Sequence, residues 1–266
     1  GIFNQRLIIA PEFFYNRSSN LLLNSRVPSS SGFKTMLRNV GRTSNRGLDL
    51  SINSVNIVTR DFQWNTALNL SVYRNRIEKL SGEEYFLEEA AFGYNDKTHI
   101  IAVGAPVGQF YGYRTVGLYQ VDDFDYDAAT GTYTLKADQP VPLYNTGVQP
   151  GYWKFEDTDK NGVIDENDKT VIGNANPKFF GGFTNNFTWR NFDASVFFTF
   201  SVGGKVLNAT KLTNSQAGRT NYNVLATMSS ADRWMTIDAN GNAVTDPTTL
   251  AALNAGKTTA SIFDTE

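Results

Sequence analysis

The sequence has no cysteine and a single histidine, His99. Without cysteine there are no disulfides, thiolate zinc sites, iron–sulfur clusters or cysteine nucleophiles. One histidine excludes His-rich metal sites and leaves at most one serine–histidine relay. The 24 Lys+Arg and 26 Asp+Glu residues give a net charge of -2, so the chain has no overall basic field. A nucleic-acid partner is therefore not expected.

Proline and long apolar runs are also scarce. The 266 residues include 8 prolines, and no run reaches the roughly 18 apolar residues of a transmembrane helix. The chain begins at Gly1 without a methionine or a signal-type apolar stretch, which predicts a processed product or a fragment. Aromatic side chains are plentiful at 13%, with 19 Phe and 12 Tyr. Because aromatic rings favour pleated surfaces, this composition indicates an all-β protein.

Apolar and polar side chains alternate over residues 61–73. The even positions are strongly apolar with one exception and read Phe62, Trp64, Thr66, Leu68, Leu70 and Val72. The odd positions carry no aliphatic side chain larger than alanine. Residues 48–52 alternate in the same way, and Thr59–Asp61 separates the two segments. A period of two on both sides of a short break predicts an antiparallel hairpin.

A second hairpin is predicted over residues 179–202. Two alternating segments, 179–189 and 192–202, flank the two-residue turn Arg190–Asn191. Strands of about 11 to 13 residues exceed the common length of about 5–6. They match the roughly 9–11 residues with which a tilted strand crosses a bilayer.

The other segments are less regular. Leu7–Tyr15 is an expected strand in which Pro11 removes one ladder donor, and Gln109–Tyr119 is expected to form one aromatic-rich strand. A helix is expected near Asn221–Trp234. Long polar connections at 122–150 and 205–266 contrast with the tight turns. Short turns at one end and long loops at the other are typical of an outer-membrane barrel.

The sharpest local motif is a calcium-type loop over residues 157–168. Oxygen-bearing residues stand at loop positions 1, 3, 5, 9 and 12, a glycine at 6 and a backbone carbonyl at 7. The predicted ligands are Asp157, Asp159, Asn161, Val163, Asp165 and Asp168. Asp168 replaces the usual glutamate, and the flanks 152–155 and 170–172 have strand character. We expect Ca²⁺ here, with Mg²⁺ as the alternative ion and an ion-free surface turn as the alternative structure.

The remaining candidates for chemistry are weaker. His99 lies in a strand-like segment and is interpreted as a packed side chain. The carboxylate pairs Glu83–Glu84 and Glu88–Glu89 could serve a glycosidase, but adjacent acids usually form a solvated surface. The acidic stretch at 122–127 is interpreted in the same way. No catalytic residue is predicted.

Several stretches in order resemble the SusC/RagA family of TonB-linked outer-membrane proteins of Bacteroidota. They are Asn39–Asp49, Phe62–Asn65, Asn69–Leu80, Gly104–Tyr113, Gly117–Gln120, Pro150–Asp159, Ile172–Gly173 with Pro177 and Gly181–Gly182, and Ala231–Trp234. The resemblance implies that residues 1–266 belong to a single domain, a segment from the C-terminal half of an antiparallel transmembrane β-barrel of about 22 strands. The calcium-type loop, 157–168, is then an insertion in that domain, and the long loops are extracellular.

The resemblance also implies a function without a chemical step. Family members import oligosaccharides or peptides across the outer membrane with a SusD-like surface lipoprotein, and the TonB complex supplies energy through an N-terminal part. On this interpretation one face contacts outer-membrane lipid, through Phe62, Trp64, Leu68, Leu70, Phe192, Phe198 and Phe200. The other face lines the lumen, through Asn65, Asn69, Asn186, Thr188, Ser195 and Thr199. The alternative is a soluble, calcium-stabilised β-sandwich that binds carbohydrate, for which strands of about 5–6 residues are expected.

Overall fold

The structure is a computed structural model that describes residues 2–26, 35–80, 82, 84–89, 97–215, 223, 225–229 and 231–261. The chain divides into two compact units. The first comprises Gly1–Tyr111 and Gly173–Val206, and the second comprises Gly112–Ile172 and Leu207–Glu266.

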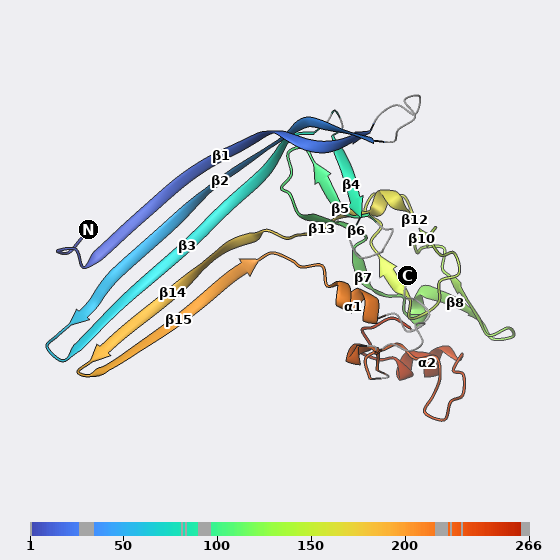
Figure 1. Cartoon of the computed structure of the whole chain (residues 1–266). Coiled ribbons are helices and arrows are strands. Elements are labelled where there is room, and N and C mark those ends of the chain that lie inside the picture. Colours follow the sequence, from blue (N-terminus) through green and yellow to red (C-terminus); the bar gives the residue numbers. More distant parts are fainter. Residues whose placement is uncertain are drawn as a thin grey trace. The chain divides into compact units, whose positions relative to one another are not determined.

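Five long antiparallel strands dominate the first unit (Figure 1). In sheet order they are β1 (Leu7–Arg26), β2 (Thr35–Val58), β3 (Phe62–Lys79), β14 (Pro177–Trp189) and β15 (Phe192–Gly203). Both predicted hairpins are confirmed, since β2 pairs with β3 and β14 pairs with β15. The two tight turns lie at the same end of the sheet in Figure 1.

The register aligns the alternating patterns of neighbouring strands. Leu68 lies opposite Ile52 on one side and Phe183 on the other, and Phe183 lies opposite Phe198. One residue along, Asn69 lies between Ser51 and Gly182. Since directly paired residues point to the same side of a sheet, one face is apolar and the other is largely polar.

Strand β1 is the outermost of the five described strands and contains Pro11. Pro11 lies opposite Leu50 of β2 within a regular register. Proline lacks a backbone N–H, so this position donates no hydrogen bond to a neighbouring strand. The strand predicted over Leu7–Tyr15 is confirmed, and it continues to Arg26.

A four-stranded sheet follows the long strands in the order β13-β6-β5-β4. Its members are β4 (Tyr85–Glu89), β5 (Lys97–Ala102), β6 (Gln109–Gly112) and β13 (Thr170–Asn174). The single strand predicted over Gln109–Tyr119 was wrong. Strand β6 ends at Gly112, and the next strand, β7 (Thr115–Leu118), pairs with β11 (Trp153–Phe155) in another sheet.

The second unit consists of short elements around two small apolar clusters. It contains η2 (Val121–Asp123), β8 (Phe124–Asp127), β9 (Thr132–Leu135), β10 (Val141–Pro142), β12 (Val163–Ile164), η3 (Glu166–Asp168), α1 (Ala209–Asn214), η4 (Ala226–Met228) and α2 (Pro247–Leu253). One cluster joins Leu118, Val121, Trp234, Leu250 and Ala260, and the other joins Tyr119, Phe124 and Val148.

The helix predicted over Asn221–Trp234 was wrong in its described part. Residues 221, 222, 224 and 230 lie outside the described residues, and the rest contain only the short 3₁₀ turn η4. Trp234 does not continue a helix, because its backbone N–H donates to the carbonyl of Thr259 at 2.8 Å. Tertiary packing of the indole, which is 2% exposed, prevails over the local apolar pattern.

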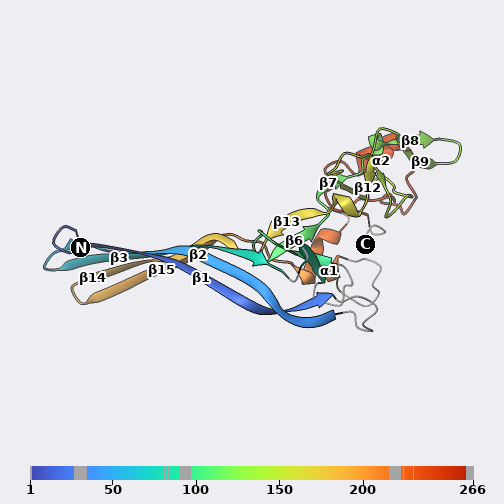
Figure 2. The same ribbon diagram turned by 90° about the horizontal axis from the view of Figure 1, so that it is seen from above.

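Strand length favours the barrel segment over the sandwich. β3 has 18 residues, β14 has 13 and β15 has 12, against about 5–6 for a sandwich strand. Figure 2 shows the long strands as a single thin layer. Among the described residues, no helix has the length and apolar character needed to cross a membrane.

Candidate functional site

The apolar face of the five-stranded sheet carries the predicted lipid-facing residues together. The row Phe62–Trp189–Phe192 lies at the tight-turn end, and the row Leu70–Gly181–Phe200 lies farther along. The aromatic rings pack across strands, with Trp64 stacked on Phe187 at 5.8 Å and Trp189 on Phe192 at 6.3 Å between centroids. Several rings are largely exposed, including Phe192 at 73% and Phe198 at 58%.

Polar residues interrupt the apolar face, among them Asn185 of β14 opposite Thr66 of β3. Asn185 accepts hydrogen bonds at 2.9 Å from both the Trp64 indole N–H and the Thr66 hydroxyl. Polar groups in an apolar environment are costly unless they are hydrogen-bonded. Asn185 is therefore compatible with an apolar surrounding.

The opposite face collects the predicted lumen residues. Asn186 lies opposite Asn65 and Ser195, and Thr199 lies opposite Gly182, which in turn faces Asn69. The Ser195 hydroxyl donates to Asn186 Oδ1 at 2.8 Å. The sheet thus has one face suited to hydrocarbon and one suited to water.

The calcium-type loop runs from Asp157, after β11, to Asp168, before β13. Three carboxylates converge in it, since Asp157, Asp159 and Asp168 each offer an oxygen within 4.8 Å of the others. The turn depends on left-handed backbone at Lys160 (φ 59°) and Gly162 (φ 85°). Asp157 accepts the backbone N–H of Gly162 at 2.8 Å, which folds the loop back on its first residue.

The other three predicted ligands lie in the loop with different immediate partners. Asp165 accepts the Asn167 N–H at 2.7 Å as the N-cap of η3, and Asn161 accepts the Val163 N–H at 2.8 Å. On either side of Val163, the carbonyl of Gly162 accepts the N–H of Val141 in β10, and the carbonyl of Ile164 accepts the N–H of Leu143 just after β10, both at 3.0 Å. Because carbonyls alternate along a strand, the carbonyl of Val163 points away from β10.

Asp168 is a buried carboxylate at the base of this loop. It is 0% exposed, and its carboxylate accepts hydrogen bonds from the backbone N–H groups of Thr158 at 2.6 Å and Asp165 at 2.8 Å. The neighbouring cation, Lys169, pairs with Glu166 instead. Burying a charge without an opposite charge is expensive, so the loop has a surplus of negative charge.

Tyr113 borders the loop and responds to its charge. Burial raises the pKa of the Tyr113 phenol to about 12, and the nearby Glu166 carboxylate adds to the effect. Its ring also packs on Phe155 at 5.1 Å and lies under the Lys169 ammonium. The phenol therefore stays neutral beside the acidic loop.

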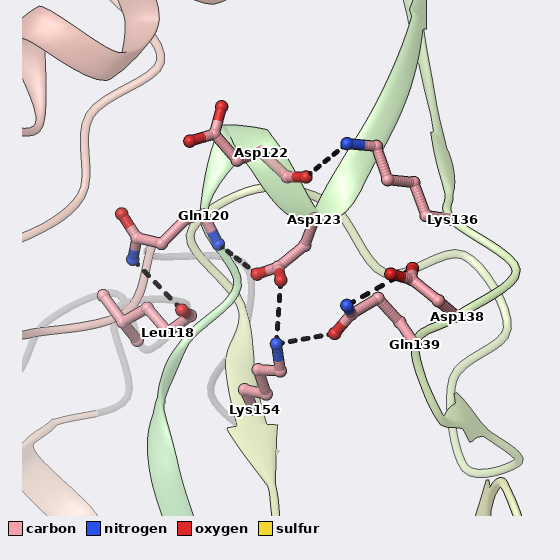
Figure 3. A network of polar contacts seen from close by, with 8 residues as sticks. All are labelled: Leu118, Gln120, Asp122, Asp123, Lys136, Asp138, Gln139 and Lys154. Carbon is pink, nitrogen blue, oxygen red and sulfur yellow. Dashed lines mark hydrogen bonds and ion pairs between the residues drawn. The ribbon is translucent and has the colours of Figure 1, made fainter.

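A polar network anchors β11, the strand that leads into the loop (Figure 3). Lys154 donates to Asp123 at 2.8 Å and to Gln139 at 2.7 Å, and its ammonium lies over the Tyr119 ring. Asp123 also accepts the Gln120 N–H at 2.8 Å. Asp123 of the acidic stretch at 122–127 thus has a structural role. Its pairing with Lys154 could not be predicted from the sequence, because no periodic pattern links the two residues.

The weaker candidates for chemistry, His99 and the carboxylate pairs, do not form a common site among the described residues. His99 lies in β5, where its ring packs on Phe110 at 5.1 Å, as expected of a packed histidine. Glu83 lies outside the described residues, as does the side chain of Glu89. The glycosidase reading therefore gains no support from the described part of the chain.

Comparison with known sequences shows which proteins this chain is similar to. No family model matches the chain. The chain is 36% identical over 214 residues to TonB-dependent receptor P3 of Formosa agariphila. The aligned residues make up 80% of this chain and 20% of that protein. It is 27% identical over 215 residues to TonB-dependent receptor SusC of Bacteroides thetaiotaomicron, covering 78% of this chain and 18% of SusC. The chain is thus similar to TonB-dependent receptors, SusC among them. It spans about a fifth of the length of these relatives.

Solved structures agree with this similarity at the level of the fold. The RagAB peptide transporter matches with a TM-score of 0.62 and 19% identity over 97% of this chain and 24% of that one. The RagAB peptide importer in its open-open state matches with a TM-score of 0.58 and 21% identity, over 81% of this chain and 21% of that one. The chain is located in the outer membrane.

Proposed function

We propose that the chain forms part of the barrel wall of a TonB-dependent outer-membrane importer that takes up oligosaccharides or peptides. The observation that carries this proposal is the two-faced sheet of long strands. Its apolar face suits contact with lipid and its polar face suits a lumen through which a hydrated nutrient passes. The likeness to SusC and to RagAB supports uptake as the function of the whole protein.

Two partners follow from the same likeness. A SusD-like surface lipoprotein would cover the outer opening, and the TonB complex would act through a part of the protein outside this sequence. The second unit, with its short elements and long connections, is the part of this chain proposed to lie outside the membrane. It would contribute to the nutrient cavity or to the lipoprotein contact.

Deletion of the gene in its own bacterium tests the import function. We expect growth to fail on one nutrient class, either an oligosaccharide or a peptide mixture, and to persist on monosaccharides or free amino acids. Small nutrients that cross general porins serve as the matched control. Affinity purification from outer membranes should recover a surface lipoprotein together with the receptor. Unchanged growth on every polymeric nutrient and recovery without a lipoprotein would contradict the proposal.

We also propose that the loop 157–168 binds Ca²⁺, with Mg²⁺ as the alternative ion. The convergence of Asp157, Asp159 and Asp168 and the burial of Asp168 without a cationic partner support it. Asn161, Asp165 and the carbonyl of Val163 would complete the ligand set when the ion binds. The role is structural, because the ion would join the end of β11 to the start of β13.

Calorimetric titration of the detergent-purified receptor tests this cation loop. Asp159 is exposed, so Asp159→Asn should leave the fold intact. It should weaken Ca²⁺ binding at least tenfold, because a charged ligand is lost. The matched control is Asp125→Asn, an equally exposed aspartate of β8, which should bind Ca²⁺ normally. Absence of Ca²⁺ and Mg²⁺ binding by the wild-type protein would exclude the cation.

A further inference from the structure

A row of arginines follows the apolar band on the same face of the sheet. Beyond the last apolar row, Leu48–Val72, the next residues on that face are Arg46 of β2 and Arg74 of β3, which lie directly opposite each other. Tyr15 of β1 completes this row opposite Arg46. One row farther, Arg76 lies opposite Ser44, and Ser44 lies opposite Arg17.

Side-chain contacts across the strands confirm that this row shares one face. Across the width of β2, Arg17 pairs with Glu78 at 2.6 Å, and the Tyr15 hydroxyl donates to the same carboxylate at 3.4 Å. Glu78 alternates in phase with Arg74 and Arg76 along β3. The arginine row therefore belongs to the apolar face and not to the polar one.

The row lies where the apolar band ends. From Phe62 to Val72 the band spans about 10 residue steps of ~3.3 Å, which is roughly 25 Å when the strand tilts by about 40°. That is the height of the apolar band of an outer-membrane barrel. The arginines thus lie at the level of the lipid headgroups, at the end opposite the two tight turns.

The positive charges in this row are not balanced by protein carboxylates. Arg17 uses Glu78, and neither Arg46 nor Arg76 has an ion pair among the described residues. Arg74 donates to two backbone carbonyls, those of Tyr73 at 2.7 Å and Lys178 at 3.1 Å, which leaves its charge uncompensated. Like charges directly opposite each other destabilise a strand pair. A bound anion between Arg46 and Arg74 would therefore stabilise the pairing of β2 with β3.

We propose that Arg46, Arg74 and Arg76 form a binding site for the phosphorylated headgroup of an outer-leaflet lipid. Arginine binds phosphate oxygens through two parallel N–H donors, and acyl chains would extend from the headgroup over Leu48, Leu70 and Val72. The continuity of the charged row with the apolar band favours a lipid over a free anion. Short turns lie on the periplasmic side of such barrels, so the opposite end faces the outer leaflet. The site depends on the membrane location of the chain but not on the import activity.

Native mass spectrometry of the complete detergent-purified receptor, titrated with lipid A that carries two phosphates, tests this site. Arg46→Gln with Arg74→Gln should weaken lipid A binding about 25-fold, or about fivefold per arginine near a charged lipid surface. Arg46→Lys with Arg74→Lys keeps the charge and should retain most of the affinity. The matched control is Arg60→Gln with Arg190→Gln, which removes two arginines at the tight-turn end and should bind like wild type.

Two further arms separate the possible sources of phosphate. Dephosphorylated lipid A should bind as weakly to wild type as lipid A binds to the double glutamine variant. Millimolar inorganic phosphate should not displace lipid A, because it lacks the acyl chains. Equal binding of both lipid forms, complete displacement by phosphate, or unchanged affinity in the glutamine variant would each overturn the proposal.

Discussion

Gly151 shows how a single residue decides the packing of the second unit. It adopts φ 92°, a conformation that side chains disfavour, and a Cβ at this position would meet the indole ring of Trp234. The resemblance to the family includes both the Pro150–Asp159 stretch and the Ala231–Trp234 stretch. The two stretches are far apart in sequence and meet here, since the glycine provides the space that the indole fills.

Gly151→Ala should destabilise the second unit by roughly 2–4 kcal/mol, as the sum of overpacking and left-handed strain. Limited proteolysis of the purified receptor, with fragments mapped by mass spectrometry, should show new cleavage within 112–172 and 207–261. Gly241→Ala is the matched control, because Gly241 has a similar φ of 84° and open space around it. It should cost only about 1 kcal/mol. Equal protease sensitivity of the two variants would show that Trp234 does not depend on this contact.

The cation loop shows what could be predicted at single residues and what could not. The spacing of oxygen donors identified the three carboxylates that converge, Asp157, Asp159 and Asp168. It did not reveal that Asp165 caps a 3₁₀ turn, because an N-cap and a calcium ligand have the same residue preference. The sequence pattern shows which residues carry oxygen atoms that can bind a cation. The local backbone determines which of these oxygens already accept hydrogen bonds.

Long strands were the elements best predicted from the sequence. The alternation in β3, β14 and β15 continues for more than ten residues and reports directly which side chains share a face. Strand β2 was less regular near Val55 and Ile57, and the structure has a register shift between these residues. A bulge adds one residue to the strand and reverses the alternation at that point.

The predictions of short elements were wrong where the pairing partner is distant in sequence. Residues 109–119 have strand composition throughout, yet β6 pairs within one sheet and β7 pairs with β11, more than thirty residues away. A local pattern contains no information about that partner, so it could not reveal the break after Gly112. The helix predicted up to Trp234 failed for a similar reason, because the indole packs against Gly151 and the chain near Thr259.

At the scale of the whole molecule, the two compact units differ in how much apolar surface they bury. The first consists mainly of a sheet with little buried interior, whereas almost all buried apolar residues of the described chain lie in the second. A sheet that is exposed on both faces lacks a core of its own, so its stability depends on what covers each face. The expectation that residues 1–266 form one barrel domain stays a prediction.

The proposed barrel wall requires that the apolar face of this sheet contacts lipid while the polar face contacts water. The adjacent residues Leu68 and Asn69 of β3 test it, because they lie near the middle of the band on opposite faces. Arginine at a lipid-facing position near the bilayer midplane costs about 2–4 kcal/mol, whereas a lumen position tolerates it. The measurement is the amount of folded, heat-modifiable receptor in the outer membrane for each variant.

Leu68→Arg should reduce the folded receptor at least tenfold, and Asn69→Arg should leave it within twofold of wild type. Equal amounts for the two variants, or a larger loss for Asn69→Arg, would contradict the assignment of the two faces.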